Sequence, residues 1–298
     1  TSGDQIRSSD GARFLQFRFD ITTEDPLAFG VLDSVAFEIA PLLADSALAE
    51  ISLLDAEQVP GAVEVPLGIE QPFAYDIRTV GGARAGFDAI ELDLPPAARF
   101  TGLDIDGTTV AEGEDFALAI ADGRFLFTFP KAFVEDKNIR VRFTSAVFQS
   151  SVFVEGRLFS SAAGSLPQSI EAGNARPDIT SDRIQVVASD TRLRVLGAVE
   201  LSSRVVTPNG DGINDRAEVA FDLFGIDGGQ VHVAVHDLAG RRITTVFAGP
   251  SQAGPYAPAW DGRDEQGSAV APGIYLIRVA LEADRGTFAR IAHIGVAY

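Results

Sequence analysis

The 298-residue sequence contains no cysteine and no methionine, and it has only one tryptophan and three histidines. Without cysteine the chain cannot form disulfides, thiolate metal sites or a cysteine nucleophile, and both exported and cytosolic compartments remain open. The sequence begins at Thr1 rather than at an initiator methionine. This start is expected of a chain that has lost a secretory leader, and equally of a trimmed one.

Basic residues are also scarce, because 24 Lys and Arg stand against 42 Asp and Glu and give a formal net charge of −18. This charge repels nucleic-acid phosphates and anionic lipid headgroups, and it favours cations and neutral polymers as partners. Long apolar runs are missing too, since Asp, Gly, Pro or Arg interrupts each one before the ~20 residues of a spanning helix. We expect no nucleic-acid binding and no membrane span.

Hydrophobic residues make up 46% of the sequence, which is enough to bury sizeable cores. Many of them alternate with polar residues. In the segment Arg13–Ile21, one face carries Leu15, Phe17, Phe19 and Ile21, as expected of a half-buried strand. The same pattern recurs, with turn residues between the segments, over 35–39, 89–94, 125–129, 139–143 and 152–159. Short strands joined by turns predict an all-β chain of tandem β-sandwiches.

Turn and composition signals divide the chain. Asp-Gly pairs at 106–107 and 122–123 predict hairpin turns, while residues 41–54 have mixed helix and strand character. A similarity between 32–54 and 87–105 suggests two related β-units, about 1–85 and 86–165, although generic alternation gives the same similarity. Residues 160–183 are rich in Ser, Ala, Gly and Pro and are expected to form a linker. Strand character returns over 184–188 and 193–201, so we place domains at 1–202 and 203–298.

The segment Thr207–Glu218 has the densest site chemistry of the sequence. It follows the calcium-loop pattern at the third, fifth, seventh, ninth and twelfth positions, which are Asn209, Asp211, Ile213 (through its carbonyl), Asp215 and Glu218. Only the first position departs, with Thr207 in place of Asp. These residues predict a bound calcium ion. The alternative is an Asx-rich turn whose side chains cap backbone amides.

Other candidate sites are weaker. His232 and His236 are separated by Val-Ala-Val, and four residues of a strand span roughly 13 Å, too far for one ion. A cluster of carboxylates could form a glycosidase pair, a second cation site or solvated turns, and it comprises Asp104, Asp106, Glu112, Glu114 and Asp115. The sequence has no nucleophile elbow, phosphate loop or zinc signature. We therefore expect that the protein is not an enzyme.

Three further motifs follow the loop in order. Together the four segments read Thr-Pro-Asn-Gly-Asp-Gly-Ile-Asn-Asp (207–215), His-Asp-Leu-Ala-Gly-Arg-Arg (236–242), Trp-Asp-Gly-Arg-Asp (260–264) and Pro-Gly-Ile-Tyr (272–275). This succession resembles the flagellar hook-cap (FlgD-like) immunoglobulin-like family, and also the C-terminal modules of type IX secretion and gliding-motility-associated proteins. The resemblance covers residues 203–298 and implies an immunoglobulin-like sandwich and export, with Trp260 as a core anchor. Residues 1–200 resemble no family that we recognise.

The sequence thus predicts a secreted or cell-surface structural or adhesive protein with calcium bracing its domain junction. A polymer-forming subunit is one form of this role, because the polar leader Thr1–Asp10 and the strand Arg13–Ile21 could pair with a neighbouring subunit. The expected partners are other copies or other surface components. The alternative is a polysaccharide-binding module with a C-terminal sorting or attachment domain, for which Tyr256 and Tyr275 are the residues to inspect. A hydrolase using carboxylates of the first 200 residues is a third reading.

Overall fold

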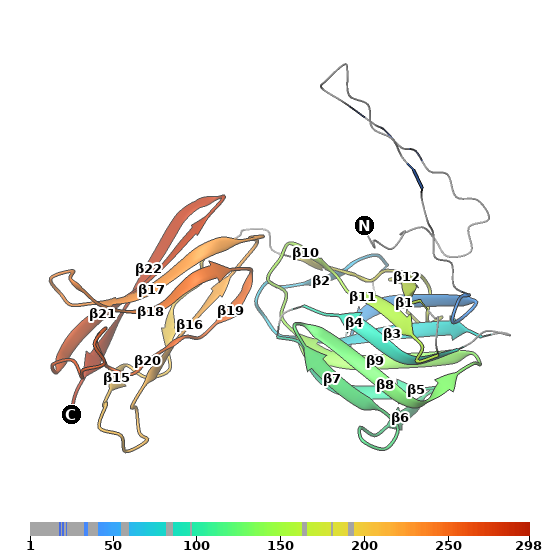
Figure 1. Cartoon of the computed structure of the whole chain (residues 1–298), viewed down its shortest axis with the longest axis horizontal. Coiled ribbons are helices and arrows are strands. Elements are labelled where there is room, and N and C mark those ends of the chain that lie inside the picture. Colours follow the sequence, from blue (N-terminus) through green and yellow to red (C-terminus); the bar gives the residue numbers. More distant parts are fainter. Residues whose placement is uncertain are drawn as a thin grey trace.

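A computed structural model gives the fold for residues 18, 20, 22, 33–34, 41–54, 60–81, 86–95, 97–162, 166–179, 181–189 and 194–298. Every regular element in this part of the chain is a β-strand (Figure 1), which confirms the prediction of an all-β protein. The described residues accordingly include no helix with the length and hydrophobicity that a membrane crossing needs. The predicted strands at 13–21 and 35–39 lie outside the described residues, apart from Arg18 and Asp20.

The first domain is built around a ten-stranded sheet. Its order is β6 (Thr108–Val110), β5 (Arg99–Ile105), β9 (Lys137–Ser145), β3 (Gln71–Val80), β1 (Ser46–Leu53), β12 (Gln168–Ala172), β11 (Glu155–Phe159), β4 (Phe87–Asp93), β8 (Arg124–Phe133) and β7 (Ala117–Ala121). Three short strands form a second sheet, in the order β10 (Ser151–Phe153), β13 (Gln185–Ala188) and β2 (Val63–Val65).

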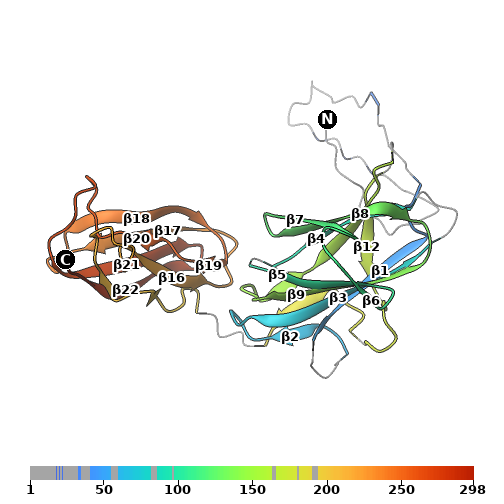
Figure 2. The same cartoon turned by 90° about the horizontal axis from the view of Figure 1, so that it is seen from below.

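The ten-stranded sheet folds over so that its two halves face each other (Figure 2). Phe100 of β5 lies 5.6 Å from Phe127 of β8, ring centroid to ring centroid, although six strands separate β5 and β8 in the sheet. The core between the halves comes from alternation. In β9, Val141 and Phe143 are fully buried while Arg142 between them points to the other face. The sandwich predicted from alternating residues is therefore present.

Local signals in this domain have mixed outcomes. The Asp-Gly pairs at 106–107 and 122–123 form the expected hairpin turns, with positive φ at all four residues. Residues 46–53 are a strand throughout rather than mixed, because Ala47, Ala49 and Ile51 alternate into the core. The two predicted β-units do not form separate sheets, since β9 lies between β3 and β5.

The linker predicted over 160–183 is wrong. Within it, β12 pairs with β1 and with β11, and Ile170 is buried in the core. The buried side chain of Gln168 accepts hydrogen bonds at Oε1 from the amides of Leu43 and Ala44, at 2.7 and 3.0 Å. The small polar residues around Ile170 resemble a linker in composition, but they form β12, which joins β1 to β11 in the ten-stranded sheet.

The second domain is a smaller sandwich with two sheets. One contains β14 (Glu200–Leu201), β16 (Ala217–Leu223), β19 (Gly254–Tyr256) and β20 (Ala259–Trp260), and the other has the order β15 (Val205–Val206), β22 (Gly286–Val296), β21 (Gly273–Ala283), β17 (Gly229–His236) and β18 (Arg242–Ser251). Trp260 is 2% exposed and packs edge-on against Tyr275, so its predicted role as a core anchor is confirmed.

Packing at the start of this domain bears on the boundary. Val195 and Leu196 belong to the second hydrophobic core, and a β-bridge joins Leu196 to Leu223. The division at 202/203 stays a prediction, but these contacts assign residues from Val195 onward to the second core.

Candidate functional site

The loop 207–218 is held by hydrogen bonds from its own backbone. The carboxylate of Asp215 accepts the amides of Gly210 and Gly212, both at 2.7 Å. Asp211 Oδ1 accepts the amide of Ile213 at 2.7 Å, and Asn209 Oδ1 accepts the amide of Asp211 at 3.0 Å. The hydrogen bond from the Ile213 amide holds the pKa of Asp211 below its usual range, and a hydrogen bond from the Asn209 side chain contributes less to this shift. This arrangement is that of an Asx-rich turn.

The remaining predicted calcium ligands are placed differently. The hydroxyl of Thr207 donates to the Ile213 carbonyl at 2.7 Å, and Glu218 is exposed in β16, with its amide bonded to the Ser202 hydroxyl. No three carboxylate or imidazole side chains gather in a metal-binding group anywhere among the described residues. Bound calcium stays a prediction of the sequence.

The junction between the two domains is packed with aromatic rings. Phe148 follows β9 in the first domain, yet it is 4% exposed and belongs to the second core. Its ring stacks on Phe224 with centroids 5.7 Å apart. A Cβ added to Gly68 would lie 2.9 Å from the Phe224 ring, so the first domain presents a bare backbone where this ring rests.

Polar contacts reinforce the same junction. The amide of Gly225 donates to the Phe148 carbonyl at 2.9 Å, and the side chain of Gln149 donates to the Ile226 carbonyl at 2.8 Å. Asp222 lies nearby, and burial together with the charge of Glu200 raises the pKa of its carboxyl above 3.8, the usual value. Residues 146–149 therefore connect the domains through packed side chains and backbone bonds.

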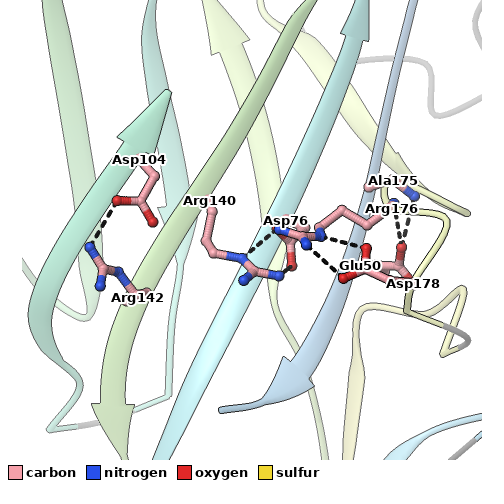
Figure 3. A network of polar contacts seen from close by, with 8 residues as sticks. All are labelled: Glu50, Asp76, Asp104, Arg140, Arg142, Ala175, Arg176 and Asp178. Carbon is pink, nitrogen blue, oxygen red and sulfur yellow. Dashed lines mark hydrogen bonds and ion pairs between the residues drawn. The ribbon is translucent and has the colours of Figure 1, made fainter. Parts of the chain in front are cut away.

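A ladder of charged residues crosses the outer face of four strands in the first domain. Asp104, Arg140, Asp76 and Glu50 are successive cross-strand partners on β5, β9, β3 and β1 (Figure 3). Arg140 donates to both oxygens of Asp76, at 2.8 and 3.0 Å. Burial raises the pKa of Asp76, and the bonds and charge of Arg140 offset part of that rise. The ladder ties neighbouring strands together through charge-assisted bonds.

Glu50 is the fully buried end of this ladder. Its Oε1 accepts the amides of Ala175 and Arg176 at 2.9 and 2.8 Å (Figure 3). Its Oε2 accepts the Ser181 hydroxyl and the Asp182 amide, both at 3.1 Å. One carboxylate thus fixes the segment 175–182 against the sheet. One feature of the sequence indicates this role: Glu50 is a charged residue in the middle of an apolar strand.

Two hollows of about 450 Å³ each lie on the described surface. The one beside the ladder is lined by Asp76, Arg140, Arg176 and Asp178, whose charges are already paired with one another. The other lies in the second domain, and its lining includes Arg216, Thr244, Asp261 and the buried Trp260. Neither presents an unpaired set of groups that indicates a ligand class.

The other predicted residues occupy structural positions. In the acidic cluster, Asp104 pairs with Arg142 and Asp106 with Lys137, while Asp115 accepts the Ala111 amide. Glu112 and Glu114 are exposed. These are the solvated or paired turn carboxylates of the third alternative.

Two histidines and two tyrosines were the remaining candidates for metal or sugar binding. His232 and His236 both lie on β17, which confirms the strand that we expected between them. Tyr256 stacks on Phe221 with its ring 5.5 Å away, and Tyr275 is buried with its hydroxyl donated to the Ala271 carbonyl. A polysaccharide-binding surface stays a prediction without support from these two residues.

The order of motifs in the second domain identifies its family. Residues 215–284 match the FlgD Ig-like domain. This match confirms the resemblance drawn from the motifs and the immunoglobulin-like fold expected for the FlgD-like module. No curated protein matches the chain.

Several solved structures have some similarity to the chain. They include dimeric latent PorU of Porphyromonas gingivalis (16% identity, TM-score 0.30, covering 84% of this chain and 20% of that one) and BcpA, the major pilin subunit of Bacillus cereus (11% identity, TM-score 0.31, 85% and 67%). The C-terminal domain of the Streptococcus agalactiae polypeptide BspA is a third (6% identity, TM-score 0.33, 85% and 100%). This chain spans a fifth of the PorU structure, and the similarities are too low to assign it to any of these proteins.

Proposed function

We propose that the protein is an extracellular structural or adhesive component of a cell surface, in which two β-sandwiches act in series. The observation that carries this proposal is the packed junction: Phe148 leaves the first domain and is buried in the core of the FlgD-like module. A flexible linker between independent domains would bury no such ring. Tandem sandwiches joined in this way suit a component that acts as a rigid spacer or transmits mechanical force.

The use of polar groups supports a role without catalysis. The buried carboxylates of Glu50 and Asp76 are engaged in strand and loop contacts, and Asp76, which lines the hollow beside the ladder, is paired with Arg140. The loop 207–218 caps its own amides, and the acidic cluster is paired or exposed. General acid and base catalysis requires titratable groups that face the same reacting atoms. The carboxylates named here are instead occupied by structural contacts or exposed to solvent.

Location and partners belong to the same proposal. A net charge of −18 favours solubility and mutual repulsion in water, and it disfavours nucleic acid as a partner. The FlgD-like module agrees with export. Other copies of the chain or other surface components are the proposed partners, and a calcium ion at the loop 207–218 would brace the module.

The proposal is tested in cells of the source organism. Antibody against the second domain should label intact cells, and a deletion strain should lose adhesion or surface structure. The wild-type gene should restore the phenotype, whereas Phe148→Ala, at equal surface abundance, should restore it less well. Labelling confined to lysed cells, or full restoration by a carbohydrate-binding domain alone, would overturn the structural role.

A further inference from the structure

The strand β7 is an unprotected sheet edge. Over its five residues, Ala-Leu-Ala-Ile-Ala, it pairs with β8 without a register shift, and no other described strand pairs with its outer side. It contains no charge and no proline. Other edges of the described sheets are blunted: β6, β2 and β10 have three residues each, and β18 carries Pro250 and two register shifts. Proteins usually protect edges with such devices, because a free edge accepts a further strand.

The apolar inner face also continues past the covered core at this edge. Leu118 and Ile120 of β7 are the cross-strand partners of Phe127 and Phe125, and direct partners share one face of a sheet. Both phenylalanines are buried, yet Ile120 is 56% exposed. Within the described part of the chain, the first sandwich therefore ends in an apolar rim at β7 that no further strand covers.

The sequence itself contains a segment of matching pattern near its start. In the segment 13–21, apolar residues occupy the alternate positions Leu15, Phe17, Phe19 and Ile21. The two described residues between them, Arg18 and Asp20, are exposed and pair with each other at 2.9 Å. Side chains two residues apart lie on the same side of an extended backbone, so this ion pair fits the polar face of a strand.

We infer that the segment 13–21 of a second copy of this chain adds to the edge of β7, with its apolar face covering Ile120 and the rim. Main-chain hydrogen bonds between the segment and β7 would supply the affinity. The alternate apolar side chains of the segment would fix the register of the pairing. The inference deepens the proposed structural function, because head-to-tail addition of identical chains builds an open polymer.

Charge and geometry favour this occupant. The turns that flank β7 are acidic, with Glu112, Glu114 and Asp115 before it and Asp122 after it, whereas the segment 13–21 carries Arg13 and Arg18 against Asp20 alone. The chain enters the first sandwich far from β7: Ser46 pairs with Val80, and Gly81 lies against Val134 beyond the end of β8. β7 pairs with the opposite end of β8, at Arg124–Thr128, so its edge is removed from Ser46, where the first described strand begins.

The absence of cysteine makes disulfide trapping a clean test. Full-length Ile120→Cys is mixed with Phe17→Cys or with Phe19→Cys, oxidised, and resolved on a non-reducing gel. The matched controls are Gln16→Cys and Arg18→Cys, which lie on the polar face of the same segment. We expect a mixed dimer from the apolar positions and its loss at the polar positions. A chain carrying both Ile120→Cys and Phe19→Cys should give a ladder of oligomers.

Three results would overturn the inference: no mixed dimer, equal yields from both faces, or a purely internal disulfide in the doubly substituted chain. The last would mean that each chain fills its own edge. Ile120→Lys provides a second measurement, since it should abolish oligomers in sedimentation while the melting temperature stays that of the wild type. Failure of trapping with surface labelling intact would refute strand addition alone, whereas loss of surface labelling would refute the proposed function.

Discussion

Replacing Phe148 by alanine should destabilise the FlgD-like module, although the residue follows a strand of the first domain. The side chain is 4% exposed and contributes to the second core, where it stacks on Phe224. Removing a buried phenylalanine costs about 3–5 kcal/mol. For a domain of roughly 100 residues, each kcal/mol lowers the melting temperature by about 4–8 °C. We therefore expect the second domain of Phe148→Ala to melt at least about 10 °C lower, even if the junction partly relaxes.

The single tryptophan makes this prediction easy to measure. Trp260 is buried in the second core, so its fluorescence reports the unfolding of that domain alone, while calorimetry reports both. Phe153→Ala is the matched control, because Phe153 is 56% exposed on β10 and its loss should change either transition little. If Phe148→Ala and Phe153→Ala give the same tryptophan transition, the junction is not packed as we describe.

Four further predictions concern other contacts. Glu50→Ala should lower the free energy of unfolding of the first domain by about 3–5 kcal/mol, because four donors lose a buried charged acceptor. Gly68→Ala should cost about 1–2 kcal/mol from its positive φ, and more where the new Cβ meets the Phe224 ring; increased proteolysis at the junction would show it. Asp222→Asn should raise the melting temperature of the second domain at pH 7 but not near pH 4. Calcium in excess over chelator should raise that melting temperature in the wild type, and Asp215→Ala should abolish the rise.

The sign of the Asp222 prediction follows from its pKa. Burial and Glu200 raise the pKa in the folded state, so the contribution of this carboxyl to stability is fully present below 3.8, its ordinary value, and is lost as the pH rises through the raised pKa. Asparagine carries no ionisable carboxyl, so Asp222→Asn removes this loss of stability at higher pH. An equal effect of Asp222→Asn at both pH values would contradict the electrostatic cause.

Controls separate the other outcomes. Glu114→Ala, at an exposed turn position, is the control for Glu50→Ala, and it should leave the melting temperature of the first domain unchanged. Identical melting curves of the wild type in calcium and in chelator would show that the loop is held by its own bonds, in which Asp215 accepts two amides. Asp215→Ala would then still destabilise the loop, without any dependence on calcium.

Alternation and turn chemistry predict much of this fold because both are local. The pattern around Val141 and Phe143 fixes which face of β9 is buried, and the Asp-Gly pairs demand positive φ wherever the strands lie. The order of motifs in the second domain likewise identifies its family before any contact is known. These features depend on residues within a few positions of one another.

The junction and the charged ladder could not be predicted in this way. Glu50 finds its amide partners about 125 residues further along the chain, at Ala175 and Arg176, and Phe148 finds Phe224 in another domain. The linker composition of 160–183 was misleading for the same reason, since Ile170 becomes core only when β12 meets β1. In the loop 207–218, one set of side chains suits calcium ligation and amide capping equally well in sequence; the structure shows the amide capping, and calcium binding stays a prediction.

The central claim, that packed side chains join two sandwiches in series, is tested most directly by a distance between them. Spin labels on Glu114→Cys and Gln266→Cys, both exposed positions of an otherwise cysteine-free chain, report the distance distribution by pulsed electron paramagnetic resonance. We predict a single narrow distribution for the wild-type junction and a broad one when Phe148→Ala is added. A distribution that is already broad with Phe148 present, and that the substitution leaves unchanged, would contradict the account.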